Sequence, residues 1–111
     1  MNEQRTGLAL AAAALTLAIA APAHAAGDIA RGETKSASCV ACHGVDGNSP
    51  SAAFPRLAGQ HASYLAHALL AYTTGERTNA IMQGLAAPLS KQDRADLAAW
   101  FASQKGLNTA R

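Results

Sequence analysis

Apolar residues recur at helical intervals in several stretches of this chain, and no stretch alternates apolar and polar residues for long enough to predict a strand. The clearest stretch lies near the C-terminus and has the spacing i, i+3, i+4 and i+7: Leu97, Trp100, Phe101 and Gln104. This spacing places both aromatic rings on the buried face of a helix. The pattern predicts an all-α chain.

Residues that cap helices mark two further elements. Asp28 can accept hydrogen bonds from the first amide groups of a short helix over 29–37. A second helix is predicted over 61–74, with Gly75 as its stop. One face of the second helix is apolar or aromatic: Tyr64, Leu65, Ala68, Leu69 and Tyr72.

The C-terminal helix is predicted to begin near Ser90, which occupies a capping position together with Asp93, and to end at Gly106. Two segments are predicted to lie outside helices. Residues 44–56 are rich in Gly, Asn, Ser and Pro and indicate an ordered loop. Residues 79–84 lie between two helical segments and are predicted to form a loop as well.

The N-terminal segment has the features of an export signal. Residues 8–21 form an uncharged, largely apolar run, which is shorter than the about 20 residues that cross a bilayer. A small-x-small pattern follows at 23–25, so we expect a cleavable signal peptide over 1–25, and a cut after Ala23 also fits. The alternative is an uncleaved membrane anchor. Cleavage leaves one domain over 26–111, which is expected to work in the periplasm.

Composition narrows what this domain can be. The formal net charge of the 111-residue chain is +2, which argues against a polybasic nucleic-acid binder. Half of the residues are hydrophobic but only 5% are aromatic, so alanine fills many apolar positions and buries little area. Two cysteines are too few for a disulfide-dense fold. A domain this small is expected to need a disulfide, a metal or a large cofactor to stabilise it.

The segment 39–43 has the form C-x-x-C-H, the attachment signature of c-type haem. Two thiols three positions apart on one helical turn can reach the two vinyl groups along one porphyrin edge and form thioethers. His43 follows directly, where its imidazole can bind the iron axially. Gly44 then lets the chain turn away close to the haem edge. The sequence therefore predicts one covalently attached haem c, held by Cys39, Cys42 and His43.

Three other kinds of site share parts of this motif. A thioredoxin-like dithiol also uses C-x-x-C, but it follows a strand, and no strand pattern precedes Cys39. A zinc site needs further Cys or His ligands at metal spacing, and the sequence has no second cluster. A disulfide between Cys39 and Cys42 would close too small a loop to explain the fold.

The second axial ligand of the iron is predicted to be Met82, so that the iron is held by His43 and Met82. Met82 is the one methionine that remains after signal cleavage, and it lies in a predicted loop. A thioether ligand raises the reduction potential relative to a second imidazole. His61 and His67 are rivals, although both fall in the second predicted helix. An open sixth position is the remaining alternative.

Four stretches resemble one known family: CVACHGVDGNS, FPRLAGQHASYL, GERTNAIM and LSKQDRADLAAWFASQ. Together they resemble the class I c-type cytochromes, specifically the bacterial c553/c4-like monohaem kind, over about residues 27–105. The resemblance implies a small all-α fold in which an N-terminal helix crosses a C-terminal helix. It also implies a haem between these helices and a loop that carries the methionine ligand.

The resemblance implies roles for individual residues as well. Gly32 resembles the point of closest approach between the two terminal helices, packed by Trp100 or Phe101. Pro55 resembles the position whose carbonyl accepts the Nδ1–H of the haem-binding histidine, a bond that would fix its tautomer. His67 departs from the family pattern, in which glutamine is commoner at that position.

These features predict a periplasmic carrier of single electrons and not an enzyme, because no set of catalytic acid, base or nucleophile is visible. Its partners are expected to be transient redox proteins, such as membrane or periplasmic oxidoreductases, with no nucleic acid and no membrane span after cleavage. Two alternatives stay open. One is the electron-accepting haem subunit of a periplasmic dehydrogenase, and the other is a gas- or peroxide-binding haem protein with an open sixth position.

Overall fold

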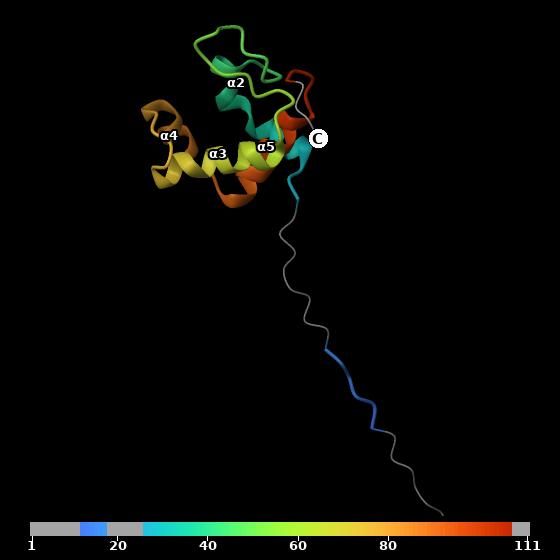
Figure 1. Ribbon diagram of the computed structural model, residues 1–111. Coiled ribbons are helices and arrows are strands. Elements are labelled where there is room, and N and C mark those ends of the chain that lie inside the picture. Colours follow the sequence, from blue (N-terminus) through green and yellow to red (C-terminus); the bar gives the residue numbers. More distant parts are fainter. Residues whose placement is uncertain (1–11, 18–25, 108–111) are drawn as a thin grey trace, which may run out of the picture.

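The computed structural model describes residues 12–17 and 26–107, and this described part folds into helices without a strand (Figure 1). The predicted all-α class is confirmed. In chain order the helices are α1 (Ile29–Lys35), α2 (Ala37–His43), α3 (Ala62–Thr74), α4 (Ala80–Ala86) and α5 (Lys91–Ser103). Of the predicted signal peptide over 1–25, only 12–17 lies within the described residues, as exposed chain without regular secondary structure.

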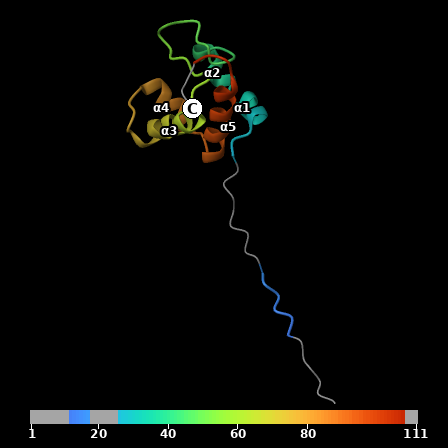
Figure 2. The same cartoon turned by 45° about the vertical axis from the view of Figure 1, so that its right-hand side comes forward.

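The two terminal helices form the centre of the fold. α1 packs against α5, and α5 also packs against α3 (Figures 1 and 2). α2 follows α1 directly and lies at one end of the molecule together with the loop over 44–61. α4 lies at the other end and packs chiefly against α3. None of the helices in the described ranges is both long and apolar enough to span a membrane.

Most of the predicted helix boundaries are confirmed. Asp28 caps α1 by accepting a hydrogen bond from the Arg31 amide at 2.7 Å. Gly75 ends α3 in the left-handed conformation, with φ of 83°, which glycine adopts without steric cost. Ser90 and Asp93 form a reciprocal capping box at the start of α5.

Two boundaries differ from the prediction. The first predicted helix is interrupted at Ser36, which is buried and donates its hydroxyl to the carbonyl of Glu33 at 2.7 Å. The chain restarts beyond Ser36 as α2, because this local bond competes with the regular helical ladder. At the other end, α5 stops at Ser103, before the predicted stop at Gly106.

The prediction of a loop over 79–84 is wrong, because most of this segment belongs to α4. Asn79 caps the helix, and its side-chain oxygen accepts a hydrogen bond from the Met82 amide at 3.0 Å. The helix is short and has Gly84 in its interior, so its pattern carries little helical signal in the sequence.

Asp96 on α5 is a buried carboxylate that ties α5 to α1. It accepts hydrogen bonds from the Asp28 amide at 2.8 Å, from Arg31 Nε at 3.0 Å and from Lys35 Nζ at 2.7 Å. Gln92 Nε2 adds a further bond at 2.8 Å. The hydrogen bond from Arg31, followed by that from Lys35, holds the pKa of Asp96 well below its usual range. Such a fully bonded carboxylate fixes the position of one helix on the other.

α1 approaches α5 most closely around Gly32, which is buried. A Cβ atom at this position would overlap the carbonyl oxygen of Asp96 and would lie 2.8 Å from the Cβ of Trp100. Of the two aromatic partners expected for Gly32, Trp100 is therefore the one that packs there. Phe101 instead packs on the loop, where a Cβ at Gly47 would lie 2.7 Å from its ring.

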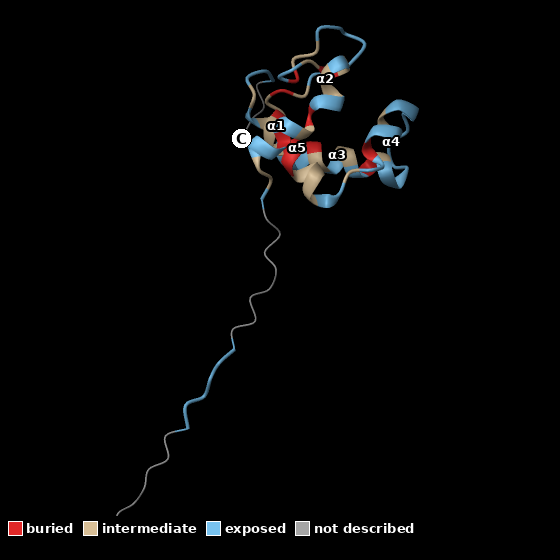
Figure 3. Ribbon diagram, turned by 180° about the vertical axis from the view of Figure 1, so that it is seen from behind, coloured by how far each residue is buried: buried red, intermediate tan, exposed pale blue. Residues whose placement is uncertain are grey.

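The hydrophobic core is small and lies between α3 and α5 (Figure 3). Its buried members are Leu65, Leu97, Ala98 and Phe101. The other buried apolar side chains within the described ranges are alanines: Ala58, Ala71 and Ala86. Because alanine contributes little apolar area, the packed core alone supplies only modest stabilisation.

We expect Gly32→Ala to destabilise the protein by about 1–3 kcal/mol, because the added methyl group overpacks the contact between α1 and α5. Gly84→Ala is the matched control, since a Cβ at Gly84 meets no atom within 4 Å. The control should stabilise α4 by up to about 1 kcal/mol through its higher helix propensity. Urea denaturation of both holoprotein variants measures the difference, and equal effects of the two substitutions would contradict the packing argument.

The aspartates on α5 make the stability of the fold depend on pH. Lys35 lies 2.8 Å from Asp93, and the pKa of Asp93 is lowered to about 2, chiefly by this hydrogen bond. The pKa values of both aspartates are lower in the fold than in the unfolded chain, where they are about 4. Both carboxylates therefore stabilise the fold above about pH 4, and this stabilisation is lost as the pH falls from about 4 to 2 and below.

Asp96→Asn should lower the thermal denaturation midpoint at pH 7, because Arg31 and Lys35 lose the charge of their buried partner. The midpoint of the variant should also fall less steeply below pH 4 than that of the wild type, because one linked carboxyl is missing. Circular dichroism melts of both holoproteins from pH 7 to pH 2 measure both effects. Parallel pH profiles would show that Asp96 does not contribute to the acid sensitivity.

Candidate functional site

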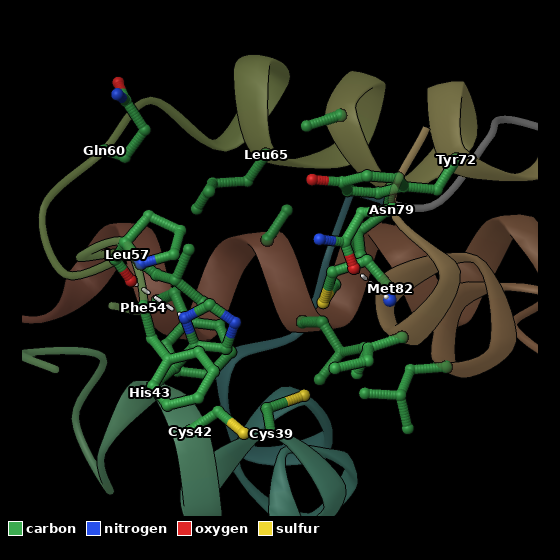
Figure 4. Close-up of a pocket in the computed structure, with 18 of the residues that line it drawn as sticks. Cys39, Cys42, His43, Phe54, Leu57, Gln60, Leu65, Tyr72, Asn79 and Met82 are labelled. Carbon is green, nitrogen blue, oxygen red and sulfur yellow. Dashed lines mark hydrogen bonds between the residues drawn. The ribbon is translucent and has the colours of Figure 1, made fainter. Parts of the chain in front are cut away.

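A cavity of about 410 Å³ opens among α2, α3, α4 and α5 (Figure 4). Its volume lies in the range of about 300–1,000 Å³ that is typical of cofactor and ligand sites. The predicted apolar face of α3 lines one side: Tyr64, Leu65, Ala68, Leu69 and Tyr72. Among the described lining residues, the side chains with a permanent charge are Arg56 and Arg77.

The cavity and the hydrophobic core are built from the same residues. Every buried member of the core cluster also lines the cavity: Leu65, Leu97, Ala98 and Phe101. Four of the partly buried side chains packed on that cluster line it as well: Cys39, Leu57, Leu69 and Leu89. A ligand in the cavity would therefore be in direct contact with the core of the protein.

The two cysteines lie on α2 at one edge of the cavity, and both are free thiols (Figure 4). Burial raises the pKa of the Cys39 thiol. A thioredoxin-like dithiol has the opposite property, a lowered thiol pKa that keeps the thiolate available. Nowhere in the described ranges do three or more His, Cys, Asp or Glu side chains gather as a metal-binding group. The raised pKa of Cys39 therefore argues against a thioredoxin-like redox centre at this site.

His43 ends α2, is buried and lines the cavity. Its Nδ1 lies 2.8 Å from the carbonyl oxygen of Pro55. A carbonyl oxygen only accepts hydrogen bonds, so Nδ1 must carry the proton and donate it. In the neutral ring this leaves the lone pair on Nε2, the nitrogen that ligates metals in this tautomer. The hydrogen bond to Pro55 that the family resemblance implies is therefore present.

The loop that carries Pro55 is fixed to α5. Within the loop, the amide of Leu57 donates to the carbonyl of Gly47 at 2.8 Å, and the amide of Gly59 donates to the carbonyl of Phe101 at 2.9 Å. Gly47 has a positive φ of 81° and packs under the Phe101 ring. The position of the His43 imidazole is thus set by both α2 and α5.

Met82 reaches the cavity from α4, on the side that faces His43 (Figure 4). It is half-buried, and Ile81 and Leu85 from the same helix line the cavity beside it. The two rival histidines are placed elsewhere. His61 precedes α3 as its N-cap and is exposed, and neither it nor His67 lines the cavity.

His67 is exposed on α3, with Nε2 4.0 Å from a carboxylate oxygen of Glu76. The helix directs it away from the cavity, since the cavity face of α3 holds other positions. The described structure therefore brings His43 and Met82 together and leaves His67 outside this pair.

Two lining residues beside Met82 were not foreseen in the sequence: Arg77 and Asn79. The guanidinium of Arg77 lies 4.9 Å from the centre of the Tyr72 ring, a cation–π contact, and donates to the Tyr64 hydroxyl at 3.4 Å. The nearness of Arg77 and Asn79 to Met82 in the sequence could have pointed to them. This signal is not specific, since arginine and asparagine are also common on exposed loops.

The residues around the cavity fit a haem group. The walls are apolar, a nitrogen and a sulfur face the cavity from α2 and α4, and two thiols stand at one edge. Arg56 and Arg77 supply positive charge suited to the two carboxylates that haem carries. Cys39, Cys42 and His43 match the C-x-x-C-H haem-binding motif residue by residue.

Comparisons with known proteins agree with this site. The family model for Cytochrome c matches residues 29–105. Cytochrome c4 of Pseudomonas aeruginosa is 55% identical over 91 residues, which make up 82% of this chain and 45% of that protein. Cytochrome c-554(548) of Halomonas halodenitrificans is 46% identical over 83 residues, 72% of this chain and 100% of that protein.

The fold agrees with a solved structure as well. Reduced recombinant cytochrome c4 from Pseudomonas stutzeri matches with a TM-score of 0.70 and 47% sequence identity, over 74% of this chain and 48% of that chain. The chain thus spans about half the length of the cytochrome c4 proteins it matches. The family match covers all five helices of the described residues, the cavity lining and the haem-binding motif. This chain therefore belongs to the cytochrome c family as a class I c-type cytochrome.

Proposed function

We propose that this protein is a periplasmic monohaem cytochrome that carries single electrons between redox partners. The observation that carries the proposal is that His43 and Met82 reach one apolar cavity from facing elements (Figure 4). Haem, when bound, supplies an iron that cycles between the ferric and ferrous states. Two ligands from the protein would keep the coordination of that iron the same in both states, so that little rearranges on electron transfer.

Cys39 and Cys42 are proposed to attach the haem. Each thiol would add its S–H across one vinyl double bond of haem: the S–H bond and the C=C π bond break, one C–S bond and one C–H bond form, and no oxidant is needed. Covalent attachment would hold the group against the core residues that line the cavity, and it would stabilise the fold.

His43 and Met82 are proposed as the two side chains that would bind the iron, and the residues around them would control how they act. The carbonyl of Pro55 holds the His43 ring in one tautomer and increases the basicity of its Nε2. A thioether from Met82 favours the ferrous state relative to a second imidazole. The apolar side chains around both residues would exclude water from the iron. A low-dielectric site disfavours the ferric state, which carries one more positive charge than the ferrous state, and this would raise the reduction potential further.

The mouth of the cavity is proposed as the place where partners dock. Tyr64 is 50% exposed and Ile81 is 64% exposed, although both line the cavity. Arg56 and Arg77 line it too, and the two carboxylates of a bound haem would balance their positive charge. This surface suits redox proteins that offer an uncharged, partly apolar face. Such complexes are transient and often bury less than about 1,200 Å².

Export to the periplasm belongs to the same proposal. It rests on the uncharged run over 8–21 and the small-x-small pattern at 23–25, which together predict removal of 1–25. The domain over 26–111 contains every residue to which we assign a role in the haem site.

Replacing the proposed methionine ligand tests the function directly. Met82→Ala should abolish the weak far-red absorption band of ferric haem and lower the reduction potential by on the order of 100 mV, within the about 0.8 V that axial ligands span. Gln83→Ala is the control and should keep both properties, because Gln83 follows Met82 on α4 and does not line the cavity. An unchanged spectrum in Met82→Ala would show that Met82 is not a ligand of the iron. Tight carbon monoxide binding by the reduced wild type would indicate an open sixth position.

Replacing both thiols tests haem attachment, and the intact mass of the exported protein tests signal cleavage. The wild type should have the mass of residues 26–111 plus one haem. Cys39→Ser with Cys42→Ser should lack the haem mass, and it should lose cooperative thermal unfolding because the haem contacts the core. A double variant that still unfolds cooperatively without haem would show that the core is sufficient alone.

A further inference from the structure

We propose that Asn79 is a positioning residue for the iron: it holds Met82 in reach of the metal by bonding the backbone of the ligand residue itself. The inference rests on the proposed ligation of the iron by Met82. It assigns to Asn79 control over how readily that sulfur is displaced.

The geometry links the two residues directly. The side-chain oxygen of Asn79 accepts a hydrogen bond from the Met82 amide at 3.0 Å (Figure 4). Asn79 has an extended backbone, with φ of −158° and ψ of 116°, as an N-cap requires. Both side chains line the cavity, so the cap of the helix and the sulfur belong to one wall of the site. The bond therefore acts on the ligand residue and not on a distant part of the helix.

The helix that carries Met82 has little else to hold its first turn. α4 spans only Ala80–Ala86, far below the length at which an isolated helix is stable. It packs chiefly against α3, and its buried residue, Ala86, lies at its C-terminal end. The N-terminal turn, with Ile81 exposed beside Met82, thus lies away from this anchor. A helix end of this kind opens locally unless its amide groups are capped.

Loss of the cap should therefore shift the iron toward the state in which the sulfur is detached. Removal of one N-cap bond typically corresponds to about a fivefold change in the equilibrium of the capped turn. An external ligand that competes with the sulfur reports this equilibrium, because its apparent affinity depends on the fraction of iron that is free of Met82. Imidazole is a suitable probe for the ferric holoprotein.

The test is the apparent dissociation constant of imidazole for ferric holoprotein variants. Asn79→Ala should lower it about fivefold, whereas Asn79→Ser, which keeps a capping oxygen, should stay near the wild-type value. Ser90→Ala is the matched control, because Ser90 caps α5 through an equivalent bond to the Asp93 amide at 3.0 Å and does not line the cavity. A general loss of stability would move both alanine variants alike, and that result would overturn the proposal.

A double-mutant cycle separates this inference from the proposed ligation. In the Met82→Ala background, Asn79→Ala should leave imidazole binding unchanged, because the sulfur through which Asn79 acts is absent. A fivefold effect that persists in this background would mean that Asn79 acts on the haem or on imidazole directly, which contradicts the positioning role. If Met82→Ala itself leaves imidazole binding at the wild-type value, the proposed ligation fails and the inference fails with it. If Met82→Ala changes imidazole binding but Asn79→Ala does not, the ligation stands and the positioning role is refuted.

Discussion

The fold depends on a core that is shared with the cavity. Leu65, Leu97, Ala98 and Phe101 are the buried members of the core, and each of them also lines the cavity. In most small domains, such residues are enclosed on all sides by other side chains at crystal-like density. Here one side of the core lines the cavity, so an apolar group bound there would complete it. On the proposed function, binding and folding are coupled, because haem would supply the apolar contacts that the alanine-rich core lacks.

The contact between α1 and α5 extends this dependence to residues far from the proposed iron site. Asp96 faces α1 and accepts hydrogen bonds from Arg31 and Lys35, while Leu97, the next residue, lines the cavity. Gly32 allows the backbone of α1 to lie directly on this part of α5. The wall of the cavity is thus held from behind by a charged cluster and a close backbone contact. A change at Gly32 or Asp96 is expected to alter the haem environment without any contact to the haem.

The parts of the site that could be predicted from the sequence are those whose signal is local. The two thiols and His43 occupy one short motif. Met82 is the one methionine after the predicted signal peptide. The caps at Asp28 and Ser90 lie next to the helices they begin. The bond from His43 to Pro55 joins separate segments, and only a family resemblance pointed to it.

α4 and the charged cluster around Asp96 were not foreseen, for different physical reasons. α4 is too short to show a helical period of apolar residues. Asp96 reads in the sequence as an ordinary solvated charge, and only the packing of α1 on α5 buries it. The same short helix makes the two sides of the proposed haem site unequal. His43 is held by α2 and by a loop that is bonded to α5, whereas Met82 lies on a helix that packs chiefly against α3. Local opening is cheapest where packing is least extensive, so the sulfur should leave the iron well before the imidazole does. On the proposed ligation, the histidine side would set where the haem sits, and the methionine side would set how readily the sulfur leaves the iron.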